Sequence, residues 1–203
     1  MAEDAIAELN RAVRAVIEKV RVTTAPDELA SESARVLQSI ADDLAPYMHE
    51  GTPAQAGLDE GGPYDMVGAS PAASFPYSPV VGSRNPISPP IDFRVTEAGL
   101  EAEHVFTAAW AGPPGAVHGG IVALVFDELL GSTNVVADVG AYTGTLSVRY
   151  HIPTPLGVSI RMLGTIVRQE GRKVMTEGKM WAGDTLTAEA EGIFILPREM
   201  GPA

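Results

Sequence analysis

The 203-residue chain contains no cysteine, so disulfide bonds, thiolate nucleophiles and cysteine-ligated zinc sites are excluded. Basic residues are also scarce, because 14 Lys and Arg stand against 26 Asp and Glu and leave a net charge of −12. Such a balance argues against nucleic acids and anionic membranes as partners. The acidity is uneven: residues 1–104 hold 7 basic and 17 acidic side chains, whereas residues 105–203 hold 7 and 9. A small polyanion therefore meets little repulsion from the second half of the chain.

Targeting signals are missing from the sequence as well. The first residues are acidic where a signal peptide is basic, and no apolar segment follows them. The longest apolar run, 119–126, stops at Asp127 and Glu128 and is too short to cross a bilayer. We therefore expect a soluble, cytoplasmic protein that binds no membrane. With 45% hydrophobic residues, the chain can build one compact core.

Residues 1–46 have the periodicity of two amphipathic helices. Apolar side chains recur every three or four residues over 4–21, and again from a start near residues 24–28 as far as Pro46. The pattern predicts an antiparallel helical pair with one buried side. That side docks on the rest of the protein or on a second subunit; a lipid- or partner-binding helix is the alternative.

Residues 47–90 have a different composition. Nine of the chain's 16 prolines fall between Pro46 and Pro90, and no periodic pattern survives there. This segment is predicted to be an extended linker or a lid-like loop. Its apolar residues give it anchors on the core: Phe75, Tyr77, Val80, Val81 and Ile87.

Residues 91–197 alternate in the manner of a domain with strands and one helix. An apolar helix is predicted from Gly119 to Leu130, and it should be buried because it is apolar nearly all round. The remaining segments read as strands: 91–96, 101–110, 145–150, 158–168, 173–182 and 185–196. The predicted fold class is α+β, with one long helix wrapped by an antiparallel sheet. A second subunit is expected to cover the far side or the edge of that sheet.

Common catalytic motifs are absent from the sequence. It contains no phosphate-binding GxxxxGK[ST] loop, no HExxH and no GxSxG nucleophile elbow. The four histidines lack metal-ligand spacing, so neither a metal nor a redox cofactor is expected.

The segment 112–128 carries the chemistry that remains. Pro113 and Pro114 interrupt the preceding strand, and a helix then begins near His118. Gly119 and Gly120 let a ligand approach the free amides at the positive end of the helix dipole. That arrangement suits the oxyanion that forms when an acyl carbonyl is attacked. The alternative is that these glycines only allow close packing of the helix against the sheet.

Asp127 interrupts an apolar stretch of the same helix. Burying an unpaired carboxylate costs several kcal/mol, so a carboxylate at this position is usually functional or tightly hydrogen-bonded. One of the two neighbours Asp127 and Glu128 is expected to face water, and we assign Glu128 to that role.

Helix geometry places His118 and Asp127 apart. Nine residues at about 100° each correspond to a half-turn, with a separation of about 13 Å along the axis. One helix therefore cannot bring its own start and its own Asp127 to the same carbonyl, whereas two antiparallel copies can. We predict an active site at a dimer interface, in a homodimer or a dimer of dimers.

These residues resemble a known family. The segment GPPGAVHGG followed by Asp127 is similar to the hotdog-fold acyl-CoA thioesterases of the PaaI-like type, in the branch with GPPG before HGG. The HGG-x6-D spacing fits, as does the strand 143–150 followed by HIPTPLG. The resemblance covers residues 91–197 and implies a substrate of the acyl-CoA class.

The resemblance also implies roles for individual residues. Asp127 is the catalytic carboxylate, acting as nucleophile or as general base on water. Gly119 supplies the main oxyanion amide, His118 binds or orients the thioester carbonyl, and Thr143 positions water or Asp127. Gly112 occupies the position at which another branch has an asparagine.

Further residues are predicted to bind substrate. Gly120 and Gly112 lie beside the carbonyl, and Arg172 and Lys173 are candidates for the phosphates of coenzyme A. Two alternative functions stay open: an acyl-thioester hydratase or dehydratase, and an acyl-CoA-binding module without catalysis. The first 90 residues lie outside the resemblance and could shape the acyl pocket.

Overall fold

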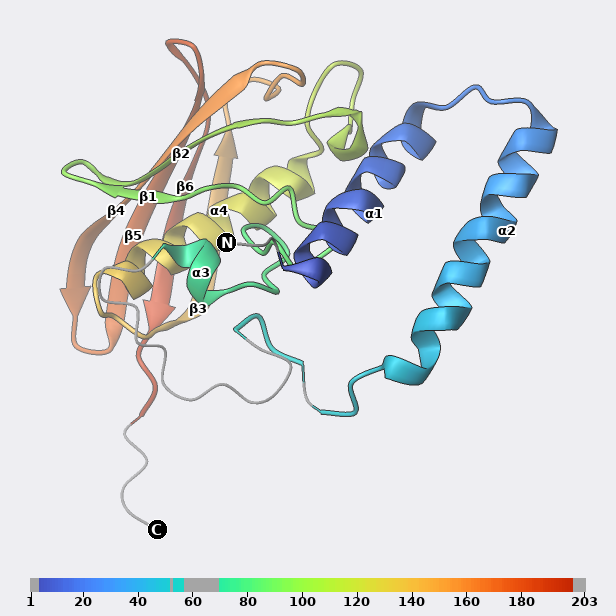
Figure 1. Ribbon diagram of the computed structural model, residues 1–203. Coiled ribbons are helices and arrows are strands. Elements are labelled where there is room, and N and C mark those ends of the chain that lie inside the picture. The colour runs from blue at the N-terminus through green and yellow to red at the C-terminus, as the bar shows by residue number, and fades with distance from the viewer. Residues whose placement is uncertain (1–3, 52, 57–69, 199–203) are drawn as a thin grey trace.

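The computed structural model describes residues 4–51, 53–56 and 70–198. Six antiparallel strands form one sheet in the order β1-β2-β4-β5-β6-β3 (Figure 1). Their bounds are Arg94–Thr96 (β1), Gly99–Val105 (β2), Tyr142–Tyr150 (β3), Ser159–Glu170 (β4), Lys173–Ala182 (β5) and Thr185–Ile195 (β6). The predicted hairpin and the four later strands are confirmed. The strand expected over 101–110 ends at Val105, and a 3-10 helix, η2 (Ala108–Trp110), follows it.

The helix α4 (Gly119–Val136) lies across the concave face of this sheet. Phe126, Leu129 and Leu130 on α4 are fully buried against the central strands. Gly178 on β5 permits this approach, because a Cβ there would lie 2.9 Å from Leu130 and 3.0 Å from Phe126. The predicted α+β hotdog fold is confirmed.

α4 is longer than predicted, since it continues to Val136 instead of ending near Leu130. The extra turns contain weak helix formers, but the fold supplies hydrogen bonds to two of their polar side chains. Thr133 Oγ1 donates to the carbonyl of Leu129 at 2.7 Å, and Thr176 Oγ1 on β5 donates to Asn134 Oδ1 at 2.7 Å. By length and composition α4 could cross a bilayer, a test that buried core helices also meet. Here its buried side packs on the sheet.

The predicted linker follows the 3-10 helix η1 (Ala45–Tyr47) and includes a short helix, α3 (Pro71–Ser74). Residues 57–69 of that segment lie outside the described residues. Phe75, Val80 and Val81 are buried in the main hydrophobic core. Ile87, in contrast to the expectation, is 59% exposed. The division of the chain at 46 and 90 stays a prediction.

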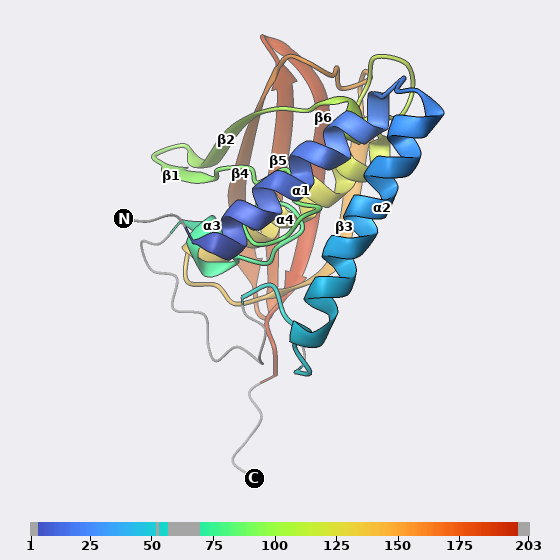
Figure 2. The ribbon, with the colours of Figure 1, turned by 45° about the vertical axis from the view of Figure 1, so that its right-hand side comes forward.

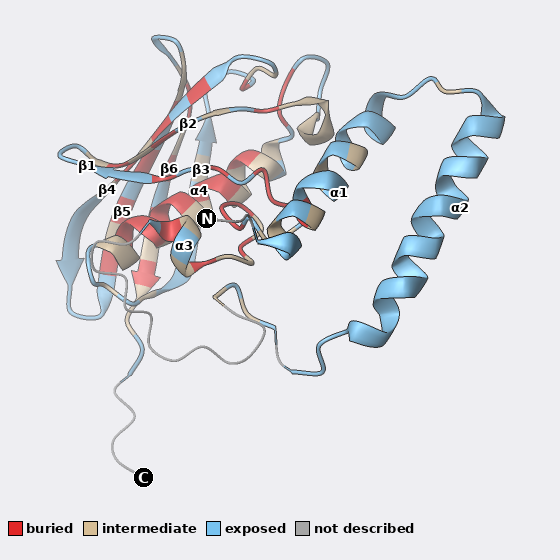
Figure 3. Cartoon of the chain, in the orientation of Figure 1, coloured by how far each residue is buried: buried red, intermediate tan, exposed pale blue. Residues whose placement is uncertain are grey.

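The two N-terminal helices occur as predicted, α1 over Ala5–Val22 and α2 over Asp27–Leu44. The expectation that the pair has one buried side is wrong for a single chain. α2 contains no buried residue, Asn10 is the buried residue of α1, and α2 stands apart from the sheet and from α1 (Figures 1, 2 and 3). Amphipathic periodicity predicts a helix that needs a partner, but it does not say that the partner belongs to the same chain.

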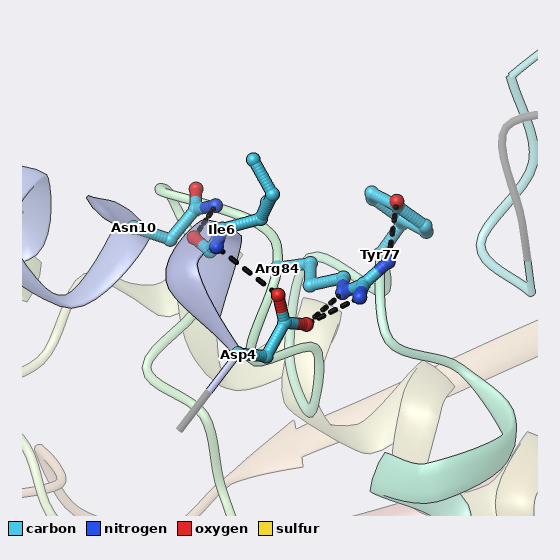
Figure 4. A network of polar contacts seen from close by, with 5 residues as sticks. All are labelled: Asp4, Ile6, Asn10, Tyr77 and Arg84. Carbon is cyan, nitrogen blue, oxygen red and sulfur yellow. Dashed lines mark hydrogen bonds and ion pairs between the residues drawn. The ribbon is translucent and has the colours of Figure 1, made fainter. Parts of the chain in front are cut away.

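α1 is attached to the body of the molecule mainly through polar contacts. Asp4 caps its start by accepting from the amide of Ile6 at 3.1 Å, and it pairs with Arg84, which also donates to the Tyr77 hydroxyl at 3.2 Å (Figure 4). Further along α1, Arg14 donates to the carbonyls of Ser83 and Asn85. This attachment leaves the apolar side of α1 exposed.

Candidate active site

Asp127 lies midway along α4 and lines a cavity of about 260 Å³. Thr143, at the start of β3, donates from Oγ1 to Asp127 Oδ1 at 2.9 Å. The cavity continues past apolar side chains, including Phe75 from the proline-rich segment and Phe194 from β6. A carboxylate oriented by a hydroxyl thus stands at the edge of a space that a small organic group can fill. For scale, an engineered apolar cavity of about 150 Å³ holds benzene.

Glu128 corrects the sequence prediction, because it lines the same cavity instead of facing bulk water. Burial raises its pKa to about 7; a hydrogen bond with Ser78 acts in the opposite direction, and the charge of Asp127 raises the pKa further. Ser78 is fully buried, and its Oγ accepts from the amides of Val80 at 3.0 Å and Val81 at 3.2 Å. Its own hydroxyl hydrogen is therefore available to Glu128. The site contains two neighbouring carboxyl groups of different character.

At the start of α4, His118 caps the helix. Its Nδ1 accepts from the amide of Gly120 at 3.0 Å, so Nδ1 carries no proton and the proton of the neutral ring is on Nε2. The prediction of two free amides is wrong for Gly120. Among the described residues, no acceptor is found for the amide of Gly119, which remains a donor for an oxyanion. His118 is exposed, so its Nε2–H is accessible to a ligand.

A second cavity, of about 270 Å³, lies at this end of the helix and is lined by Gly119, Val122 and Tyr150 among others. The Tyr150 hydroxyl, at the end of β3, donates to the carbonyl of Gly119 at 2.8 Å. Gly112 lies close behind, since a Cβ there would be 2.6 Å from the Cα of His118. The absence of a side chain at Gly112 is therefore needed for the loop to pass His118.

The two cavities have no lining residue in common. β3 spans them, because Thr143 at its start contacts Asp127 and Tyr150 at its end contacts Gly119. The carboxylate at the middle of α4 and the oxyanion amide at its start thus lie in separate cavities of one chain, in agreement with the helix geometry.

Arg172 and Lys173 are not close to the start of α4. Arg172 lies in the turn between β4 and β5, and Lys173 is the first residue of β5. The Arg172 guanidinium donates to the carbonyl of Leu196 at 2.9 and 2.6 Å. Lys173 pairs in the sheet with Ile195, one residue from Phe194 of the Asp127 cavity. Any role in phosphate binding stays a prediction. Within the described part of the chain, no group of three or more His, Asp or Glu side chains could hold a metal ion.

Three contributors to the site escaped the sequence analysis as functional residues: Glu128, Ser78 and Tyr150. Tyr150 was visible as part of a strand motif, but its contact with Gly119 depends on how β3 crosses the start of α4. Ser78 lies in a segment without periodicity, and no local pattern indicates that it reaches α4.

A central helix on a six-stranded antiparallel sheet, with a carboxylate at its middle and a free amide at its start, defines a hotdog-fold protein with two separated half-sites. Comparison with solved structures agrees: a thioesterase superfamily protein, RHA08564, superposes with a TM-score of 0.79 and 28% identity over 95% of this chain and 91% of its own. No family model matches the sequence.

Curated relatives add the sequence evidence. Acyl-coenzyme A thioesterase THEM4 from Xenopus laevis is 37% identical over 86 residues, which are 41% of this chain and 39% of that protein. The Mus musculus THEM4 is 34% identical over 86 residues, 41% and 37% of the two chains. The chain thus spans about two fifths of the length of these relatives. The resemblance to hotdog-fold acyl-CoA thioesterases that the motifs predict is confirmed.

Proposed function

We propose that this protein hydrolyses an acyl-CoA thioester to a free acid and coenzyme A. The observation that carries the proposal is the Asp127 carboxylate, held by Thr143 at 2.9 Å on the wall of a cavity large enough for an acyl group. The similarity to THEM4 and to the thioesterase superfamily structure supports the same reaction.

The reaction follows from the chemistry of these groups. Asp127 accepts a proton from a water molecule while the water oxygen bonds to the thioester carbon. The carbonyl oxygen becomes an oxyanion, and the amide of Gly119 and the Nε2–H of His118 donate to it. The carbon–sulfur bond then breaks with its electron pair on sulfur. The thiolate of coenzyme A leaves, and the proton held by Asp127 passes to that sulfur or to solvent.

A second copy of the chain completes the site in this proposal. β3 is an edge strand, and most of its residues are exposed. An unpaired edge of nine residues is a template for another strand. Antiparallel pairing of two β3 strands about their midpoint sets the start of one beside the end of the other. Because Thr143 marks the first end and Tyr150 the second, Asp127 of one copy approaches Gly119 of its partner.

Gly119 offers a sharp test of this assignment. It is the first residue of α4, and His118 before it has φ −61° and ψ 133°, a conformation that suits the residue before a proline. Gly119→Pro therefore removes the amide hydrogen at the helix position that tolerates proline best. Gly119→Ala is the matched control, because its Cβ would meet Tyr150 at an ordinary 3.7 Å and the amide hydrogen stays.

We expect thiol release from acyl-CoA to fall at least about 100-fold in Gly119→Pro and in Asp127→Asn, and by less than about threefold in Gly119→Ala. Mixing the two inactive variants should restore about a quarter of the wild-type sites, since half of the dimers are mixed and each has one intact site. Near-wild-type activity of Asp127→Asn would overturn the catalytic role. The absence of recovery on mixing, with subunit exchange verified, would place both half-sites in one chain.

A further inference from the structure

The helix α2 carries an apolar stripe that nothing in its own chain covers. The stripe runs along one face at positions i, i+7, i+8, i+11 and i+15, and all its side chains are at least 41% exposed: Leu29, Val36, Leu37, Ile40 and Leu44. Five acidic residues and one arginine give α2 a net charge of −4. Most of the stability of a helix in a protein comes from packing of its amphipathic face, so α2 needs a surface to pack against.

A groove of matching character lies between α1 and the body of the molecule. Its volume is about 440 Å³, and its walls are largely apolar, with Ile17 from α1, Ile87 and Trp110 among them. Ile17 and Ile87 remain 40% and 59% exposed on its rim. α1 makes polar contacts with the body, and Ile17, on its exposed apolar side, also lines the groove.

Charge distinguishes the groove from the rest of the acidic N-terminal half. Arg11 and Arg14 line it, and α1 as a whole has four basic and two acidic side chains. Burial lowers the pKa of Arg14, and the positive charge of Arg11 lowers it further. Glu18 also lines the groove, where it accepts from the Thr107 hydroxyl at 3.1 Å. Two guanidinium groups thus stand against one carboxylate on the walls of the groove, which gives it a positive formal charge.

α2 is an acidic ligand of matching character, because two of its carboxylates border its apolar stripe. Glu32 and Asp43 both lie within about 90° of the centre of the apolar stripe, on the same flank. An apolar face bordered by carboxylates thus matches an apolar groove bordered by guanidinium groups. No residue of the same chain's α2, which lies wholly within the described residues, lines the groove, and Figure 1 shows α2 away from α1, which leaves the α2 of another copy to fill the groove.

We infer that the groove between α1 and the body binds the α2 helix of a second copy of this chain, with the exchange made reciprocally in a two-fold assembly. Each copy then contributes one groove and one helix, and the arrangement closes without leaving either surface exposed. The thioesterase superfamily structure, which matches 95% of this chain, supports a shared placement of the helical segments. The inference does not depend on the proposed activity.

The absence of cysteine from the chain allows a direct test. Ile87→Cys places a thiol on the groove rim of one copy, and Leu37→Cys places one in the stripe of a copy with a different tag. After co-expression, a bismaleimide several ångströms long should join the two variants in one covalent dimer. Ser31→Cys, on the opposite face of α2, is the control and should give at most one fifth of that yield.

A second measurement keeps the inference testable if a cysteine variant folds poorly. Leu37→Glu with Ile40→Glu adds two charges to the stripe, whereas Ser31→Glu with Ala34→Glu adds two charges at the same spacing away from it. Sedimentation velocity should show association weakened at least tenfold in the first variant alone. The inference would be overturned if the cross-link formed only within one chain, or if no cross-link formed at all. Equal cross-linking yields from the two faces of α2 would also overturn it, as would equal association of the two glutamate variants.

Discussion

Glu128 allows a prediction about stability that is independent of catalysis. Its pKa is raised to about 7 from an ordinary value of 4.5, chiefly by burial. A raised pKa means that the folded state retains a proton that the unfolded state releases. The stabilisation is therefore complete below pH 4.5 and is lost as the pH rises through 7. Above that range the folded protein contains an ionised, partly buried carboxylate.

Substituting Glu128→Gln removes this titration and keeps an acceptor for the Ser78 hydroxyl. The shift corresponds to about 3 kcal/mol, at about 1.4 kcal/mol per pKa unit. The free energy of unfolding of the variant, relative to the wild type, should therefore increase by about 3 kcal/mol between pH 4.5 and pH 8. Urea denaturation followed by circular dichroism, at one fixed chain concentration because assembly contributes to stability, measures this difference.

Glu97→Gln is the matched control for this experiment, because Glu97 lies exposed in the turn between β1 and β2. Its difference from the wild type should stay constant across the same pH range. A Glu128→Gln difference that varies by less than about 1 kcal/mol, or one that decreases as the pH rises, would refute the assignment of Glu128 to a desolvated site.

Three further substitutions test individual contacts. Thr143→Val removes the hydrogen bond to Asp127 and should lower kcat about tenfold with little change in melting temperature; an unchanged kcat would show that the bond does not position the carboxylate. Tyr150→Phe removes the bond to the carbonyl of Gly119 and should cost about 1 kcal/mol in urea denaturation, and no loss would mean that the helix start needs no such support. Gly164→Ala places a methyl group against α4 and should destabilise by about 2 kcal/mol in the same assay, whereas wild-type stability would mean that the helix can shift away.

Local patterns were sufficient for the type and order of the long helices and strands, but not for all of their ends. The turn sequences at 169–172 and 182–184 bounded β5 as residues 173–182, and the glycines at 171 and 183 in those turns have positive φ. The end of α4 was missed for an equally physical reason. Thr133 and Asn134 disfavour a helix locally, and only hydrogen bonds within the helix and with β5 compensate for that preference.

In the candidate site, too, some features follow from the local sequence and others depend on tertiary packing. The spacing of His118, Gly119 and Asp127 by itself determined that the start of the helix and the carboxylate lie on opposite sides of it and about 13 Å apart along its axis, because helical rise and twist are constants. The spacing could not predict that Glu128 is partly buried, because its hydrogen-bond partner Ser78 comes from a segment fifty residues away along the chain. Two adjacent carboxyl groups look alike in sequence, and only the packing around each decides which is desolvated.

The N-terminal helices show most clearly what a sequence pattern leaves undetermined. The sequence alone determined that α1 and α2 are amphipathic helices, since the 3.6-residue period of their apolar side chains is a local property. Only the tertiary structure decided that α1 docks through polar contacts and that α2 touches little of its own chain. Burial is a relation between surfaces that are distant in sequence, and a periodic stripe records the need for a partner without naming it.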